Sequence, residues 1–184
     1  MPRSRKKLRT VSDKTLLVKG SDHLFRELIT NLHIMAQQLI GLRAHMAEEL
    51  GVTGPQFSLL LAVAHAQDEE GLEEGINVSR LARQLRVTPA FVTTEAGKLI
   101  AQRLLAKRGS TVDRRGVLLS VTERGHRRLM TFAPRLQQVN DEIFGSLDAR
   151  TFRNLARTTK GLVEGGERAL QSRAKKKNRG RGRS

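Results

Sequence analysis

Residues 77–122 read NVSRLARQLRVTPAFVTTEAGKLIAQRLLAKRGSTVDRRGVLLSVT, and this stretch decides the fold of the chain. Asn77 is a residue type that caps helices, and Val78, Leu81, Ala82 and Leu85 follow it at helical spacing. The pattern predicts a short helix with one apolar face. After the break at residues 86–87 comes a second helix signal.

That signal is Thr88-Pro89, a capping hydroxyl followed by proline at the first helical position. The pattern predicts a helix from Pro89 to about Arg103. Two short helices separated by a two-residue break are typical of a helix-turn-helix.

The second helix has two different faces. An apolar stripe is formed by Val92, Ala96 and Leu99, and the opposite face carries Ala90, Thr93, Thr94, Gly97 and Lys98. Small side chains let a helix approach base edges closely, and threonine offers a hydroxyl and a methyl group suited to thymine. The alternative for this face is ordinary exposure to solvent.

Residues 104–108 and 117–121 predict two strands around a polar segment at 109–116. A basic hairpin beside a recognition helix can reach the minor groove, where the negative potential attracts arginine. The stretch therefore predicts a winged helix that binds double-stranded DNA.

The sequence resembles the MarR family of bacterial transcriptional regulators between about Asp22 and Leu170. The resemblance is carried by Leu81-Ala82, Val92-Thr93, Leu99, Asp113-Arg114-Arg115, the segment 117–122 and Gly125. It implies a mainly α subunit (an α+β winged helix) of six helices with a β-wing, which dimerises through its N- and C-terminal helices. It also implies that Arg115 enters the minor groove and that Asp113 holds the wing arginine. The alternative for Asp113 and Arg115 is a solvated turn pair.

The candidate DNA-binding residues are therefore Ala90, Thr93, Thr94, Lys98, Asp113, Arg114 and Arg115. Three positions depart from the family pattern. Arg86 stands where the turn between the helices often has glycine, so a strained or different turn is expected. Arg103 replaces the glycine that commonly ends the second helix, which puts the left-handed cap there in doubt. Glu95 stands where the family is usually apolar, and a buried carboxylate there needs a partner.

The formal net charge is +16, and residues 80–128 hold 12 basic and 3 acidic side chains. This distribution indicates a phosphate-binding face on the winged helix. The chain has no tryptophan, no tyrosine and six phenylalanines, which favours duplex binding over single-strand stacking.

Other classes of protein are disfavoured. The chain has no cysteine, so it has neither disulfides nor a thiol switch. The five histidines lack paired zinc-ligand spacing and no phosphate loop occurs, so we expect no enzyme activity, no metal and no cofactor. The longest apolar run is about half a membrane span, so we expect a cytoplasmic protein without a membrane partner.

We expect one MarR-like domain at residues 15–171 between a disordered basic arm (1–14) and a disordered basic tail (172–184). Within it, the winged helix occupies about 53–125, and dimerisation helices occupy about 22–50 and 122–171. Asp22 and Asp148 are expected to cap the first and last of these helices, with a bend at Pro134.

The resemblance also implies a small-molecule cleft between the first helix, the helix containing Phe57 and the reading head, with an aromatic acid or its derivative as the effector. His33 and Gln37 on the first helix are candidates for the polar lining beside Phe57. The alternative is that both polar side chains are merely solvent-exposed.

These patterns together predict a homodimeric, sequence-specific regulator on a pseudopalindromic operator, a repressor released by a small anionic aromatic effector. The alternative is an architectural protein that coats DNA through its basic tails without ligand control.

Overall fold

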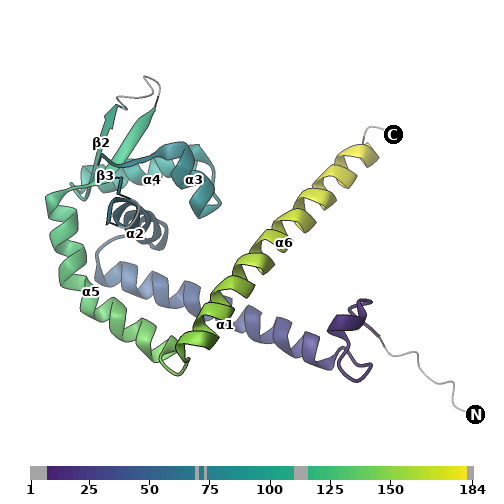
Figure 1. Ribbon diagram of the computed structural model, residues 1–184. Helices are drawn as coiled ribbons and strands as arrows, with labels where there is room; N and C mark the ends of the chain where they lie inside the picture. Colours follow the sequence, from purple (N-terminus) through teal and green to yellow (C-terminus); the bar gives the residue numbers. More distant parts are fainter. Residues whose placement is uncertain (1–7, 69–70, 73, 110–115, 182–184) are drawn as a thin grey trace, which may run out of the picture. The chain divides into compact units, whose positions relative to one another are not determined.

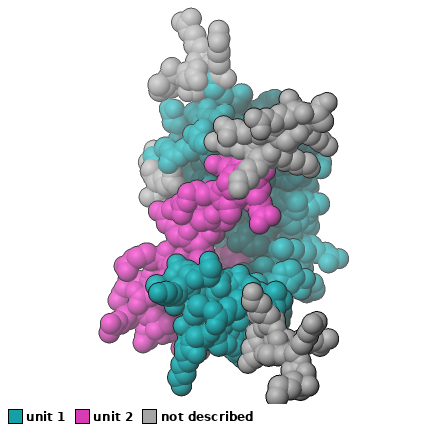
Figure 2. All heavy atoms as spheres, turned by 90° about the vertical axis from the view of Figure 1, so that its right-hand side faces the viewer, with its two compact units in different colours: residues 1–132 teal, residues 133–184 magenta. Residues whose placement is uncertain are grey.

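The computed structural model describes residues 8–68, 71–72, 74–109 and 116–181. The chain divides into two compact units, residues 1–132 and 133–184, which Figure 2 colours separately. Unit 1 contains η1 (Lys14–Leu16), α1 (His23–Glu49), α2 (Gly54–Asp68), β1 (Ile76–Asn77), α3 (Val78–Leu85), α4 (Pro89–Ala101), β2 (Leu105–Gly109), β3 (Val117–Val121) and the first part of α5 (Glu123–Phe144). Unit 2 contains the rest of α5 and all of α6 (Ala149–Arg181).

Helix α2 is the centre of unit 1. It packs against α1, α3, α4 and β3, and Figure 1 shows it between α1 and the helix-turn-helix. Phe57, Leu60 and Val63 are at most 1% exposed, which explains why α2 is apolar on nearly all sides. The Phe57 ring meets Phe132 of α5 edge to face, with ring centroids 5.8 Å apart.

The three strands form one antiparallel sheet in the order β1-β3-β2. The β2–β3 hairpin pairs Leu105 with Val121 and Lys107 with Leu119. The two predicted strands are therefore confirmed, and so is the mainly α winged-helix fold of six α-helices with a β-wing among the described residues. The sequence analysis missed β1, which pairs Ile76 with Leu119 on the other side of β3.

The junction between the sheet and α5 is built around Gly125. A Cβ at this position would clash with the Leu104 carbonyl oxygen, so a side chain does not fit. Thr122 Oγ1 accepts a hydrogen bond from Gly125 N at 3.0 Å and donates to Arg103 O at 2.7 Å. Arg103 has φ 60°, so this arginine adopts the left-handed conformation expected of a glycine.

The ends of the chain differ from the sequence prediction. Thr10 donates from N and Oγ1 to Asp22 Oδ2 at 2.7 and 2.8 Å, so part of the predicted disordered arm is bonded to the start of α1. Asp22 is the N-cap residue, but its side chain makes no capping hydrogen bond.

Asp148 caps α6 by accepting from Thr151 N at 2.7 Å, as predicted. Helix α6 continues to Arg181, so residues 172–181 are helical where a tail was expected.

Helix α5 continues through Pro134. Of the helices in the described ranges, none is both long enough and apolar enough to span a membrane.

Candidate nucleic-acid interface

Side-chain caps start both helices of the helix-turn-helix. Asn77 Oδ1 accepts from Ser79 N at 2.8 Å, and Thr88 Oγ1 accepts from Phe91 N at 3.2 Å, with Pro89 in the first turn of α4. Between them Arg86 has φ 59°, a left-handed conformation that costs a residue with a side chain about 1–2 kcal/mol. The caps predicted from the sequence are therefore present, and the turn is closed by a strained arginine.

Helix α4 separates its two faces as predicted. Val92, Ala96 and Leu99 are at most 2% exposed. The exposed face carries Ala90, Thr93, Thr94, Gly97 and Lys98. Thr93 Oγ1 donates to Pro89 O at 3.0 Å, which orients the hydroxyl and leaves its lone pairs and its methyl group available to a ligand. Around Gly97 no atom lies within 4 Å of a built Cβ, so this part of the face is open.

Glu95 has the partners that its burial requires. The residue is 8% exposed, and its Oε1 accepts from Lys98 Nζ at 2.7 Å while its Oε2 accepts from Gln56 Nε2 at 3.1 Å. The hydrogen bond from Lys98 lowers the pKa of Glu95, burial opposes this shift, and the Gln56 hydrogen bond lowers the pKa further. Glu95 is therefore ionised at neutral pH.

A groove of about 650 Å³ runs beside the exposed face of α4. It is lined by residues of β1, α3, α4 and the two wing strands, β2 and β3. Among its lining residues are Arg83, Thr93, Gly97, Lys107 and Val117. The concave surface thus joins the predicted reading face to the base of the wing.

The wing is anchored near the loop end of its strands. Arg108 Nε donates to the Glu74 carbonyl oxygen at 3.0 Å, which ties β2 to the segment before β1. The predicted wing-tip residues Asp113, Arg114 and Arg115 lie outside the described residues.

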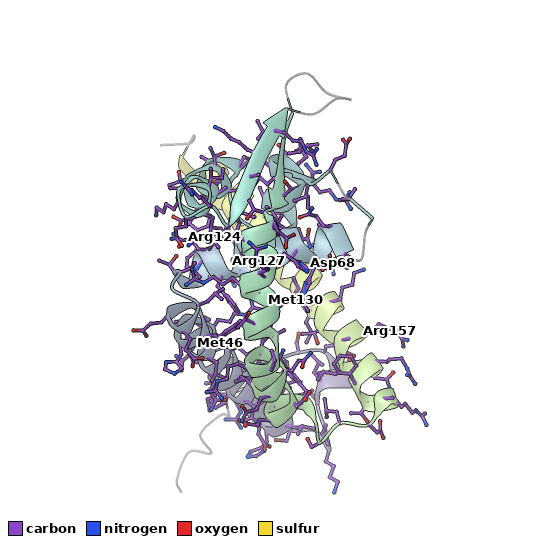
Figure 3. All side chains as sticks on the ribbon, turned by 90° about the vertical axis from the view of Figure 1, so that its left-hand side faces the viewer. Met46, Asp68, Arg124, Arg127, Met130 and Arg157 are labelled. Carbon is purple, nitrogen blue, oxygen red and sulfur yellow. The ribbon has the colours of Figure 1, made fainter. Side chains whose placement is uncertain are left out.

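Part of the basic charge counted for residues 80–128 lies away from α4. Arg124, Arg127 and Arg128 come from the first turns of α5, where Figure 3 labels Arg124 and Arg127. They line a hollow of about 460 Å³ with Glu49 and Phe132, and Arg127 pairs with Glu123 at 3.1 Å. The basic footprint is therefore divided between the winged helix and α5.

Two of the candidate effector-binding residues lie together on the surface, and the third is buried. His33 and Gln37 are exposed on α1 and their Nε2 atoms lie 3.1 Å apart, whereas Phe57 is buried against Phe132. A mostly apolar cavity of about 500 Å³ lies instead between α1, α2 and the α3–α4 turn. Its lining is Ile40, Arg43, Ala44, Gly54, Pro55, Ser58, Leu85, Val87 and Phe91.

Arg43 gives this cavity a cationic group. Its Nη1 donates to Ser58 Oγ at 3.2 Å, which orients the guanidinium group between α1 and α2. The sequence analysis missed Arg43 and Phe91 because it sought polar residues along one line of α1. The spacing of Arg43 within an amphipathic helix does not distinguish it from a solvent-facing arginine.

The arrangement described above defines the class. A capped helix-turn-helix with an exposed second helix, followed by a β-hairpin, is a winged helix-turn-helix domain. Residues 50–116 match the family model described as "MarR family".

Three known proteins are similar to this chain in sequence or in fold. The chain is 28% identical over 108 residues to the HTH-type transcriptional repressor MdtR of Bacillus subtilis, an alignment that covers 59% of this chain and 65% of MdtR. Its fold is similar to that of CouR from Rhodococcus jostii bound to p-coumaroyl-CoA, with a TM-score of 0.66, 17% identity and coverage of 77% of this chain and 95% of CouR. It is also similar to a mutant of E. coli MarR complexed with operator DNA, with a TM-score of 0.60, 20% identity and coverage of 82% and 99%. The family match is confined to residues 50–116, and together with the similarity to MdtR it agrees with the resemblance to the MarR family found in the sequence.

Proposed function

We propose that the protein is a homodimeric regulator of transcription that binds double-stranded DNA at a specific pseudopalindromic site. The observation that carries the proposal is the face of α4, where Ala90, Thr93, Thr94 and Gly97 are exposed beside a groove that leads to the wing. Such a face suits close approach to base edges in the major groove. MdtR, its relative, is a repressor, and we propose repression for this chain as well.

The proposed dimer rests on apolar side chains that a single chain leaves exposed. On α1, Leu24, Leu28 and Ile29 are about half exposed, at 55%, 49% and 49%. On α6, Phe152 and Leu162 are 52% and 53% exposed. Burying such side chains between two subunits is favourable at about 25 cal/mol per Å². Sedimentation that detects only a folded monomer at micromolar concentration would contradict the dimer.

The experiment for DNA binding is selection of duplexes from a random library, followed by a footprint on the selected site. Two reading heads on one duplex should protect half-sites about 10 base pairs apart, centre to centre. Continuous protection along the duplex would instead support the architectural alternative, which the basic side chains between Arg173 and Arg183 favour.

At the wing we propose that Arg115 contacts the minor groove and that Asp113 holds the wing arginine. Arg115→Ala should weaken binding to the selected duplex by about 1–3 kcal/mol per subunit, with a much smaller effect on a scrambled duplex. Deleting residues 172–184 should weaken both by similar factors, because contacts between basic side chains and phosphates carry no sequence information. If Arg115→Ala weakens binding to both duplexes equally, the wing contributes only charge and does not read sequence.

For the effector we propose a small aromatic acid or its derivative in the cavity between α1 and α2. The apolar lining suits an aromatic ring, and the Arg43 guanidinium group suits a carboxylate. His33 and Gln37 are our candidates for a further polar contact on α1. A panel of aromatic carboxylates and thioesters should raise the unfolding temperature and weaken DNA binding, and Arg43→Met should abolish both effects. A panel without effect on either quantity would contradict the effector proposal and leave the DNA-binding proposal standing.

A further inference from the structure

Lys98 is not a free surface cation. Its Nζ lies 2.7 Å from Glu95 Oε1, one turn earlier on α4, and its side chain is 54% exposed whereas that of Glu95 is 11% exposed. The ammonium group therefore sits at the edge of the exposed face with one N–H directed into the protein and two N–H groups left for another acceptor.

The position of Glu95 is itself set from α2. Gln56 Oε1 accepts from Thr53 N at 3.1 Å, so the Nε2 end of the Gln56 amide must point to Glu95 Oε2, 3.1 Å away. Rotating the amide by half a turn would place its oxygen against a carboxylate, which cannot donate when ionised. Gln56 is 3% exposed and its hydrogen bond to Glu95 is buried, whereas the hydrogen bond from Thr53 at the start of α2 is partly buried.

The buried carboxylate also limits where Lys98 can go. If the ammonium group left Glu95 to follow a distant phosphate, Gln56 would be the only hydrogen-bond partner of the ionised carboxylate among the described residues, and leaving a buried charge underpaired is costly. Lys98 must therefore contact DNA from within hydrogen-bonding distance of Glu95. A fixed donor with two N–H groups suits the N7 and O6 acceptors of guanine, whereas a phosphate contact needs no such restraint.

We propose that Glu95 is a positioning residue that holds the Lys98 ammonium group so that it reads a guanine at one position of each half-site. This inference rests on the proposed function and adds a specificity determinant to it. It also accounts for a carboxylate on the DNA-binding helix, where Coulomb repulsion from phosphates alone would disfavour one.

The experiment compares three variants of the full-length protein by selection from a random duplex library. Glu95→Gln keeps the size of the side chain and removes its charge, and Lys98→Met removes the donor. Glu123→Gln is the matched control, because it also removes one carboxylate, from the exposed pair with Arg127 on α5. Glu95→Gln and Glu123→Gln change the net charge equally, so long-range attraction to DNA changes alike.

We expect the wild type and Glu123→Gln to select the same site, with a guanine that both Glu95→Gln and Lys98→Met lose. On the wild-type site, the ratio of specific to scrambled-duplex affinity should fall about tenfold per subunit in both variants. The double variant should show no further loss, since both changes remove the same contact. A structural role for Glu95 would weaken the preference at every position instead.

Three results would overturn the inference: Glu95→Gln keeps the guanine preference, it loses preference at all positions, or Lys98→Met selects the wild-type site unchanged. Thermal unfolding checks that each variant folds. If Glu95→Gln does not fold, Glu95→Asp replaces it, since a carboxylate withdrawn by one methylene should cause the same loss at the same base pair. If the wild type selects no sequence, the proposed function fails too. If it selects a site that Glu95→Gln reads normally, only this inference fails.

Discussion

Gly97 offers a substitution that should improve folding while damaging DNA binding. It lies in the interior of α4 on the exposed face, and a Cβ built there meets no atom within 4 Å. Alanine is favoured over glycine inside a helix by about 0.8–1.0 kcal/mol. Because no contact offsets this gain, Gly97→Ala should raise the free energy of unfolding by about 1 kcal/mol and the unfolding temperature by about 2–4 °C.

In the proposed complex with DNA, the same methyl group would stand between α4 and the bases. If the exposed face of α4 lies in the major groove, the added methyl displaces the helix or a base contact, at about 1–3 kcal/mol per subunit. Thermal unfolding followed by circular dichroism gives the first quantity. Titration of a labelled duplex selected by the wild type gives the second.

Gly41→Ala is the control, because Gly41 is also exposed inside a helix, α1, with no atom within 4 Å of its built Cβ. It should stabilise the protein similarly and leave the affinity for DNA unchanged. Equal affinities of the two variants for the selected duplex would refute the placement of the α4 face against the base pairs.

Three further predictions concern stability. Arg103→Gly should raise the free energy of unfolding by up to about 1 kcal/mol, since relief of the left-handed strain, about 1–2 kcal/mol, exceeds the extra chain entropy of glycine; a lower denaturant midpoint would contradict this. Gly125→Ala should destabilise the protein by about 1–3 kcal/mol or more, because its Cβ would meet the Leu104 carbonyl oxygen, whereas Gly161→Ala, with open space around it, should not. The wild type should be more stable than Glu95→Gln at neutral pH. This difference in the free energy of unfolding should decrease in acid, because the native pKa of Glu95 is lowered below the ordinary value of 4.5. That difference begins to fall near pH 4.5 and is lost as the pH drops through the native pKa, so an unchanged difference between pH 7 and pH 3 would argue against an ionised Glu95.

The helix-turn-helix could be predicted from sequence because its signals are local. Asn77, Thr88 and Pro89 act within three residues of their own positions, and the apolar stripe of α4 follows helical periodicity. Strand β1 has no such signal. It is two residues long, and its pairing with β3 depends on residues more than forty positions away.

Partners of charged residues were equally hard to predict. The sequence marked Glu95 as needing a partner, but Gln56 comes from another helix and no local pattern connects them. Asp22 occupies the predicted capping position, yet its carboxylate bonds to Thr10, a partner from the segment expected to be disordered. At residues 172–181 the high helix propensity of lysine, arginine and alanine outweighed a basic composition that favoured disorder.

Phe91 lines the cavity between α1 and α2 and is 39% exposed in the first turn of α4, directly after Ala90 of the exposed face. The chain contains neither tryptophan nor tyrosine, so its intrinsic ultraviolet fluorescence is close to zero. One tryptophan at position 91 would therefore emit without background from a site that touches both the cavity and the start of α4. Its emission maximum and quenching would follow ligand entry and duplex binding in the same cuvette.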